Sequence, residues 1–144
     1  MNQFKPLGNG TLIGPQPSES DLRQARQKGI KTVIDLRLPS ETPTPNAELV
    51  ARSGLDYVNI PVNKASLSSD QVDALDRAMQ DKDGPFLLHC ASGVRAATLL
   101  VLSRTRQNGW TAQRAFQEAR AMGFDLENAP EFADFIRSTA GSRA

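Results

Sequence analysis

The 144-residue sequence contains only one cysteine and one histidine, next to each other at Cys90 and His89. A single thiol cannot form a disulfide within the chain, and one cysteine with one histidine is too small a ligand set for a structural zinc site. Walker-type and dinucleotide-binding glycine motifs are also missing. We therefore predict no metal, no cofactor and a cytoplasmic setting, where thiols stay reduced.

An excess of charge of one sign is missing as well, since 17 basic residues face 16 acidic ones. Without a block of like charge or interleaved basic and aromatic residues, the sequence predicts no nucleic-acid partner. No apolar run approaches the ~20 residues that span a bilayer. The N-terminus also lacks the apolar segment of a secretory signal, so no membrane association is expected. The oligomeric state is left open.

The sequence does contain an alternation of strand and helix patterns, which we interpret as one domain over residues 1–144. Such an order is typical of an α/β fold: a three-layer α/β/α arrangement around a mainly parallel sheet of four to five strands. The expected core covers about residues 11–123, followed by a C-terminal helix at about 129–139. The expected strands cover 11–13, 32–36, 57–60 and 86–89, and the helices before the C-terminal one begin near residues 19, 46, 69, 96 and 111.

Three loops are expected at one edge of this sheet. In open parallel sheets, ligands bind outside the carboxyl ends of the strands. The loops that follow the predicted strands there are 37–45, 62–69 and 90–95. The sequence thus predicts a binding crevice built from these loops.

The most informative segment is FLLHCASGVRAATLLVLSR, residues 86–104. An apolar strand ends at His89-Cys90, a short loop follows, and Arg95 stands at the start of an apolar helix. The first N–H groups of a helix have no intrahelical partner, and together with the helix dipole they favour an anion. The same field stabilises a thiolate at Cys90. The pattern predicts an oxyanion cradle with a reactive sulfur, rather than a buried structural thiol.

Three neighbours of Cys90 have expected supporting roles. Gly93 permits a positive φ or a close approach of the ligand to the backbone. Arg95 can hold two oxygens of a tetrahedral anion with its planar guanidinium group. His89 is expected to support the loop through a hydrogen bond to nearby backbone, which excludes a chymotrypsin-type triad.

Four segments resemble a known family: GPQPSESDL (14–22), KGIKTVIDLR (28–37), YVNIPV (57–62) and GPFLLHCASGVRAA (84–97). In these segments the chain resembles the cysteine-dependent protein tyrosine and dual-specificity phosphatases. Within that superfamily it is similar to a small bacterial branch that is also found fused to beta-lactamase-like hydrolases. The resemblance covers about residues 11–123.

The resemblance implies a dual-specificity-phosphatase-like fold and a nucleophilic Cys90 that forms a phosphocysteine intermediate. It also implies that the backbone of Ala91, Ser92, Gly93 and Val94, together with Arg95, binds the phosphate. The expected partner is a phosphorylated small molecule or protein.

The loop departs from that family in length, because four residues separate Cys90 and Arg95 where ordinary members have five. This length is similar to that of rhodanese-like sulfurtransferases, which carry a persulfide on the cysteine. Ala96 also replaces the usual Ser or Thr after the arginine, with Thr98 and Ser92 as possible substitutes. The alternatives to a phosphatase are therefore a sulfurtransferase and a non-catalytic phosphate-binding module.

The general acid is the second departure, since Asn63 stands where the family's acid loop carries aspartate. Of the other carboxyls that could border the crevice, Glu41 is favoured over Asp35 and Asp70. Two basic residues near the crevice have open roles. Arg37 could bind an anionic substrate or pair with Glu41, and Lys64 could attract phosphate or remain solvated.

Overall fold

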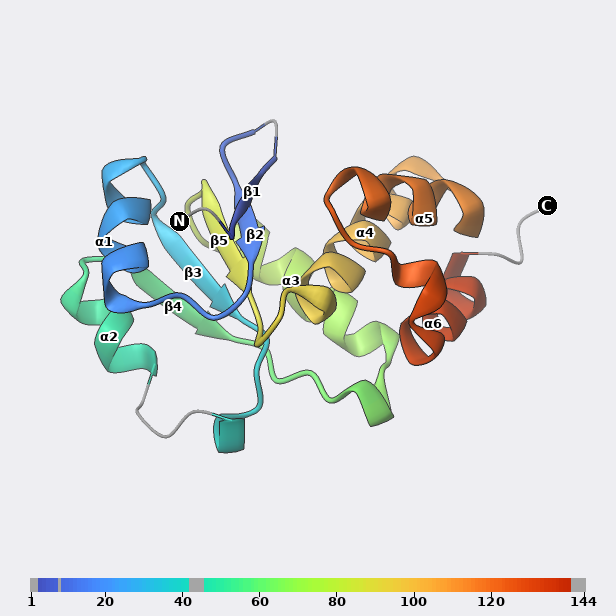
Figure 1. Cartoon of the computed structure of the whole chain (residues 1–144), viewed down its shortest axis with the longest axis horizontal. Helices are drawn as coiled ribbons and strands as arrows, with labels where there is room; N and C mark the ends of the chain where they lie inside the picture. The colour runs from blue at the N-terminus through green and yellow to red at the C-terminus, as the bar shows by residue number, and fades with distance from the viewer. Residues whose placement is uncertain (1–2, 8, 42–45, 141–144) are drawn as a thin grey trace.

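The computed structural model describes residues 3–7, 9–41 and 46–140, and its centre is a five-stranded sheet (Figure 1). Along the sheet the strand order is β1-β2-β5-β3-β4, with β1 antiparallel to β2 and the other neighbours parallel. The predicted mainly parallel sheet is confirmed. The edge strand β1 was not predicted, because two residues are too few to show an alternating pattern. The strands are β1 (Lys5–Pro6), β2 (Leu12–Gly14), β3 (Thr32–Asp35), β4 (Asp56–Asn59) and β5 (Phe86–His89).

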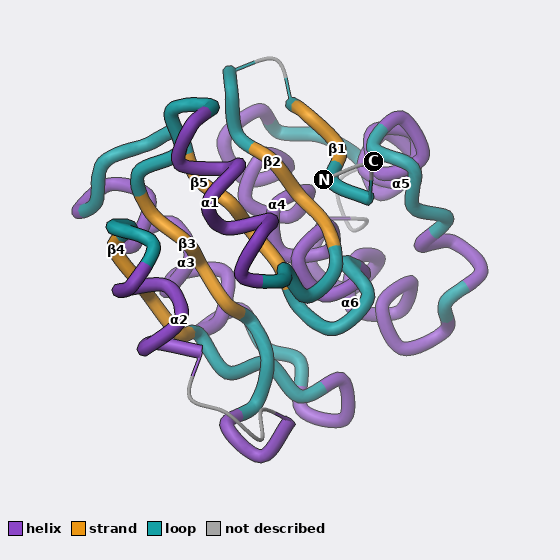
Figure 2. Tube along the Cα trace, turned by 60° about the vertical axis from the view of Figure 1, so that its left-hand side comes forward, coloured by secondary structure: helices purple, strands orange, loops and turns teal. Residues whose placement is uncertain are grey.

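Helices cover both faces of the sheet, as predicted for three layers (Figures 1 and 2). The first two helices pack on one face and enclose a core around Leu22 and Val33. The next two pack on the other face, with the last two against the outer side of the fourth. The helices are α1 (Glu19–Gln27), α2 (Asn46–Arg52), α3 (Ser69–Asp81), α4 (Val94–Asn108), α5 (Ala112–Ala121) and α6 (Pro130–Ala140).

Short polar side chains fix where the helices begin. Ser18 accepts a hydrogen bond from the Asp21 N–H, and Asp21 accepts one from the Ser18 N–H, which satisfies two backbone donors at the start of α1. At the start of α3, the Gln71 side chain accepts a hydrogen bond from the Ser68 N–H at 3.0 Å. Thr111 caps α5 through the Arg114 N–H. These local signals explain why the predicted starts of the helices agree with the observed ones.

Residues 96–103 of the central helix α4 are buried, because the sheet, α3, α5 and α6 all contact this helix. The apolar run in this part of the helix requires such an environment. Its packing fixes the position of its first turn, and therefore of the loop between β5 and α4. In the described part of the chain, no helix is both long and apolar enough to cross a membrane.

Candidate active site

The loop between β5 and α4 wraps around the sulfur of Cys90. Gly93 adopts a left-handed conformation (φ +100°) immediately before the first helical residue, Val94. This turn directs the Gly93 N–H toward the sulfur, and the N–Sγ distance is 3.0 Å. The expected positive φ at Gly93 is therefore confirmed.

Neighbouring segments hold this loop in place. The Ala91 carbonyl accepts a hydrogen bond from the Gln16 N–H at 3.3 Å. On the other side, the ring of Phe124 packs against Gly93, so closely that a Cβ atom there would lie 2.7 Å from Cζ of the ring. The same Cβ would lie 3.3 Å from the carbonyl carbon of Gly14. Both the backbone conformation and the surrounding space thus require glycine at position 93.

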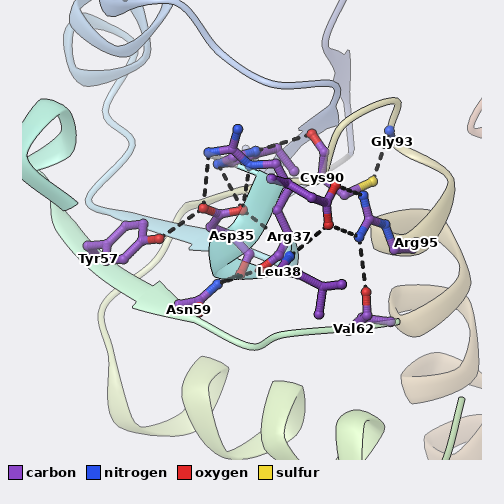
Figure 3. A network of polar contacts seen from close by, with 11 residues as sticks. Asp35, Arg37, Leu38, Tyr57, Asn59, Val62, Cys90, Gly93 and Arg95 are labelled. Carbon is purple, nitrogen blue, oxygen red and sulfur yellow. Dashed lines mark hydrogen bonds and ion pairs between the residues drawn. The ribbon is translucent and has the colours of Figure 1, made fainter. Parts of the chain in front are cut away.

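The sulfur of Cys90 lies beneath the surface of the loop, because the residue is 0% exposed. Its surroundings are not purely apolar. Figure 3 shows the side chain of Arg95 beside the sulfur and the Gly93 N–H on its other side. In this conformation, a ligand can reach the sulfur only after the atoms above it move.

Arg95 is held by two loops that are distant in sequence (Figure 3). Its Nη1 and Nη2 donate to the two carboxylate oxygens of Glu41 at 2.7 and 2.8 Å. Nη1 also donates to the Val62 carbonyl at 3.0 Å. Because a guanidinium carries five N–H donors, these three contacts leave one N–H on Nε and one on Nη2. The two remaining donors share one edge of the group, the geometry that binds two oxygens of an anion. The Arg95 side chain also forms a hydrogen bond with the Cys90 side chain.

Glu41 is a strong acceptor in this pair. The hydrogen bonds from Arg95 lower the pKa of Glu41 to about 2, despite some opposing desolvation, and the Leu38 N–H adds a further donor at 2.8 Å. The carboxylate is therefore ionised at neutral pH. The expectation that Glu41 serves as the general acid is wrong for this arrangement, because the group holds no proton to donate.

A buried polar cluster supports the loop from below. Asp35 accepts hydrogen bonds from the Arg37 backbone and side chain and from the Tyr57 hydroxyl (Figure 3). Burial raises the pKa of Asp35, but these bonds outweigh it and the net shift is downward. The ring nitrogen Nδ1 of His89 lies 3.4 Å from the Cys90 carbonyl, in line with the predicted supporting role.

Two further expectations for this cluster are wrong. Arg37 was expected to bind substrate or pair with Glu41, but it is 1% exposed and its Nε donates to Asp35 at 3.0 Å. Asp35 was a candidate acid, yet it is also 1% exposed and bonded within the cluster. Both side chains follow β3 into the interior instead of turning out toward the crevice.

The burial of His89 gives a prediction for stability. Desolvation lowers its pKa from 6.5 to about 4, although Asp35 partly opposes the shift. As the pH falls below 6.5, the unfolded chain binds a proton at this histidine and the folded chain does not, so stability falls until about pH 4. At about 1.4 kcal/mol per pKa unit, the loss is about 3 kcal/mol.

Urea unfolding of the wild type and of His89→Gln between pH 7 and pH 4 measures this effect. We expect the variant to show a flatter dependence of the unfolding free energy on pH, even if its stability at pH 7 is lower. Equal slopes for the two proteins would contradict a buried neutral imidazole. The carboxylates whose pKa values are lowered also reduce the unfolding free energy as the pH falls, but mainly below about pH 4.

A cavity of about 550 Å³ opens above the loop. The three predicted loops all contribute to it, which confirms the expected crevice at the carboxyl edge of the sheet. Its fourth wall is the start of α6, which the sequence did not indicate, because no local pattern shows which distant helix reaches the crevice. The described residues that line the cavity are Leu38, Glu41, Asn63, Lys64, Ser92, Val94, Arg95, Ala129, Glu131 and Phe132.

Other predicted site residues have different positions. The Asn63 side chain caps the 3₁₀ turn Lys64–Ser66 by accepting the Ala65 N–H, so its amide is engaged with the loop. Asp70 is exposed in the first turn of α3 and does not line the cavity. The Thr98 hydroxyl donates to the Val94 carbonyl at 2.8 Å within α4. Of the two possible substitutes for the missing Ser or Thr, only Ser92 lies at the cavity.

The sequence matches the family described as "Beta-lactamase hydrolase-like protein, phosphatase-like domain" over residues 3–107. The chain belongs to this family. The match contains β1 to β5 and nearly all of α4, and thus the whole loop around Cys90. The predicted relationship to the phosphatase branch fused to beta-lactamase-like hydrolases is therefore confirmed. The family match ends before α5 and α6, so the α6 wall of the cavity lies outside it.

Two bacterial relatives extend the comparison. The Beta-lactamase hydrolase-like protein of Xylella fastidiosa (strain Temecula1 / ATCC 700964) is 32% identical over 122 residues, covering 81% of this chain and 28% of the relative. That of Agrobacterium fabrum (strain C58 / ATCC 33970) is 29% identical over 119 residues, covering 79% and 28%. This phosphatase-like chain therefore spans little more than a quarter of these longer proteins.

Solved structures confirm the predicted fold. "Putative phosphatase (DUF442)" from Shewanella putrefaciens CN-32 is 25% identical with a TM-score of 0.78, covering 96% of this chain and 88% of that one. A structure from Neisseria meningitidis Z2491 is 26% identical with a TM-score of 0.74, covering 88% and 93%. TpbA of Pseudomonas aeruginosa shares the fold at 16% identity and a TM-score of 0.78, covering 95% and 84%.

Proposed function

We propose that this chain hydrolyses phosphomonoesters through a phosphocysteine intermediate on Cys90. The observation that carries the proposal is the position of the sulfur, which accepts the Gly93 N–H at the start of α4 and lies beside Arg95. Backbone donors, the helix dipole and a guanidinium all favour negative charge at this point. Membership of a phosphatase-like family supports the same chemistry.

In the proposed reaction, the Cys90 thiolate attacks phosphorus. The sulfur–phosphorus bond forms while the ester oxygen leaves with its electron pair. The backbone N–H groups of residues 91–94 and the Nε–Nη2 edge of Arg95 bind the remaining phosphoryl oxygens, whose charge they stabilise. Water then attacks phosphorus, the thiolate leaves, and inorganic phosphate is released.

The substrate class follows from the relatives and the cavity. The TpbA structure contains phosphotyrosine, and the yeast relative SIW14 is described as a PP-IP phosphatase. In this chain, Leu38, Val94 and Phe132 give the cavity apolar walls around Arg95 and Lys64. We propose a phosphorylated small molecule or protein as substrate. A cytoplasmic location and a bacterial source remain predictions.

The test is hydrolysis of 4-nitrophenyl phosphate by the purified chain from mildly acidic to neutral pH. Acid quenching during turnover, followed by peptide mass spectrometry, is expected to show one phosphoryl group on the peptide that contains Cys90. Absence of turnover across that range would contradict the proposal. If the protein then still bound inorganic phosphate, it would be a non-catalytic phosphate-binding module.

The four-residue spacing between Cys90 and Arg95 supports one alternative, a sulfurtransferase. That activity needs no general acid, which agrees with Asn63 in the acid loop. Incubation with thiosulfate and cyanide distinguishes the two reactions. Thiocyanate formation together with a persulfide on Cys90 would favour sulfur transfer, and neither is expected for a phosphatase.

Glu41→Gln gives a prediction for the role of the Arg95 pair. The amide keeps the size of the side chain but loses the charge and one acceptor oxygen for the guanidinium. Because small displacements of a positioning group are costly, we expect kcat/KM for 4-nitrophenyl phosphate to fall about 10²-fold. The matched control is Glu118→Gln, which breaks a surface pair with Arg114 on α5. An increase in kcat/KM would instead mean that Glu41 repels phosphate and blocks the site.

A further inference from the structure

The cavity contains a carboxyl group that no step described above uses. Among the described residues that line it, two carry carboxylates, Glu41 and Glu131. Glu41 is engaged with both Nη atoms of Arg95. Glu131 is exposed, and it makes no hydrogen bond or ion pair with any residue that the structure describes. The cavity thus holds one carboxylate that positions an arginine and one with no structural partner.

Glu131 belongs to a different element than the loop around Cys90. It is the second residue of α6, and its neighbours Ala129 and Phe132 line the same cavity. Ser92 from the loop and Val94 and Arg95 from the start of α4 also line it. In an in-line displacement, the leaving oxygen points away from the attacking sulfur. The proton donor for that oxygen therefore has to come from the residues that line the cavity around the substrate.

We propose that Glu131 is the catalytic general acid of this protein, in place of the acid-loop position that Asn63 occupies. The inference rests on the proposed phosphatase function. As the bond between phosphorus and the ester oxygen breaks, the Glu131 carboxyl gives its proton to that oxygen and becomes a carboxylate. In the second step, the carboxylate takes a proton from the attacking water and is restored.

Three other charged residues line the same cavity as Glu131: Lys64 from the 3₁₀ turn, Arg95 from α4, and Glu41. If Glu131 had no catalytic role, its negative charge would only repel a phosphate dianion. Removing the charge would then raise kcat/KM. The two roles thus predict changes of opposite sign in kcat/KM when the Glu131 charge is removed.

The experiment compares two substrates, 4-nitrophenyl phosphate with a well-stabilised leaving group and phenyl phosphate with a poorer one. A general acid contributes about 10²–10⁴-fold, and the contribution is greatest when the leaving oxygen is basic. We expect Glu131→Gln to lower kcat about 10²-fold for phenyl phosphate and less than about 5-fold for 4-nitrophenyl phosphate. The alkaline limb of the phenyl phosphate pH profile should disappear, and Glu131→Asp should recover part of the rate.

The matched control is Asp134→Asn. Asp134 lies on the same helix with its side chain 82% exposed, and it does not line the cavity. Equal losses on both substrates, no loss, or an increase in kcat/KM for Glu131→Gln would overturn the assignment. Failure of the wild type to hydrolyse either substrate would instead overturn the phosphatase function itself, so the two failures are distinguishable.

Discussion

Cys90→Ser is expected to lower kcat for 4-nitrophenyl phosphate by about 10⁴-fold or more and to leave the fold intact. Removing the nucleophile of an enzyme that forms a covalent intermediate has effects of this order. A serine hydroxyl is far less acidic than a thiol, so the helix start cannot supply a comparable nucleophile. The replacement is nearly isosteric, and its oxygen can still accept the Gly93 N–H. This residue is 0% exposed, so no surface property changes.

The measurement pairs steady-state kinetics with thermal unfolding and binding of inorganic phosphate. We expect a change in Tm of only a few degrees and phosphate affinity within about threefold of the wild type, because the backbone donors and Arg95 are unchanged. The residual rate of Cys90→Ser also measures any contaminating phosphatase. A variant that keeps more than about one tenth of the wild-type rate would show that the nucleophile lies elsewhere.

Gly93→Ala is expected to reduce both stability and activity. The left-handed backbone (φ +100°) costs an L-residue about 1–2 kcal/mol. The added Cβ would also lie 2.7 Å from the Phe124 ring and 3.3 Å from the Gly14 backbone. We therefore expect a loss of about 2–3 kcal/mol in the unfolding free energy. The rate should fall at least about 10²-fold, because the Gly93 N–H that faces the sulfur would be displaced.

Gly29→Ala is a matched control for the backbone cost alone. Gly29 also has a positive φ, +98°, but a Cβ there would meet nothing within 4 Å, and the residue lies after α1. We expect it to lose about 1–2 kcal/mol and to keep full activity. Adding Phe124→Ala to Gly93→Ala removes the contact with the ring. The double variant therefore separates the cost of the backbone conformation from the cost of the steric contact. Wild-type activity in Gly93→Ala would contradict the role of this turn.

The loop around Cys90 could be predicted because its determinants are local. An apolar strand, a short turn with one glycine and an apolar helix follow each other within 19 residues, FLLHCASGVRAATLLVLSR. The predicted helix starts near residues 19, 69 and 111 are local in the same way. The structure confirms them, with Ser18 and Thr111 capping α1 and α5 through their side chains. The convergence of three loops also followed from the sequence, since parallel strands place their carboxyl ends at one edge.

The errors concern side chains whose direction depends on the tertiary structure. Glu41 was considered an acid, and only its contact with Arg95, 54 residues later, makes it an ionised positioning group. Arg37 was expected at the crevice, but it is buried and its side chain bonds to Asp35, two residues earlier. The Glu41 pair depends on which loops meet, and the burial of the Arg37 pair depends on the elements packed around β3, so a local pattern shows neither.

Local sequence patterns alone predict the alternation of strands and helices, the helix starts and the glycine turn beside the Cys90 sulfur. These features depend on hydrogen bonds and apolar periodicity within a few residues. The packing of segments that are distant in sequence sets which charges lie together in the cavity, and it places Glu131 of α6 in the cavity lining. A carboxylate's protonation and reach depend on groups within a few ångströms in space, and the packing of α6 against α4 brings residues 131 and 95 to the same cavity.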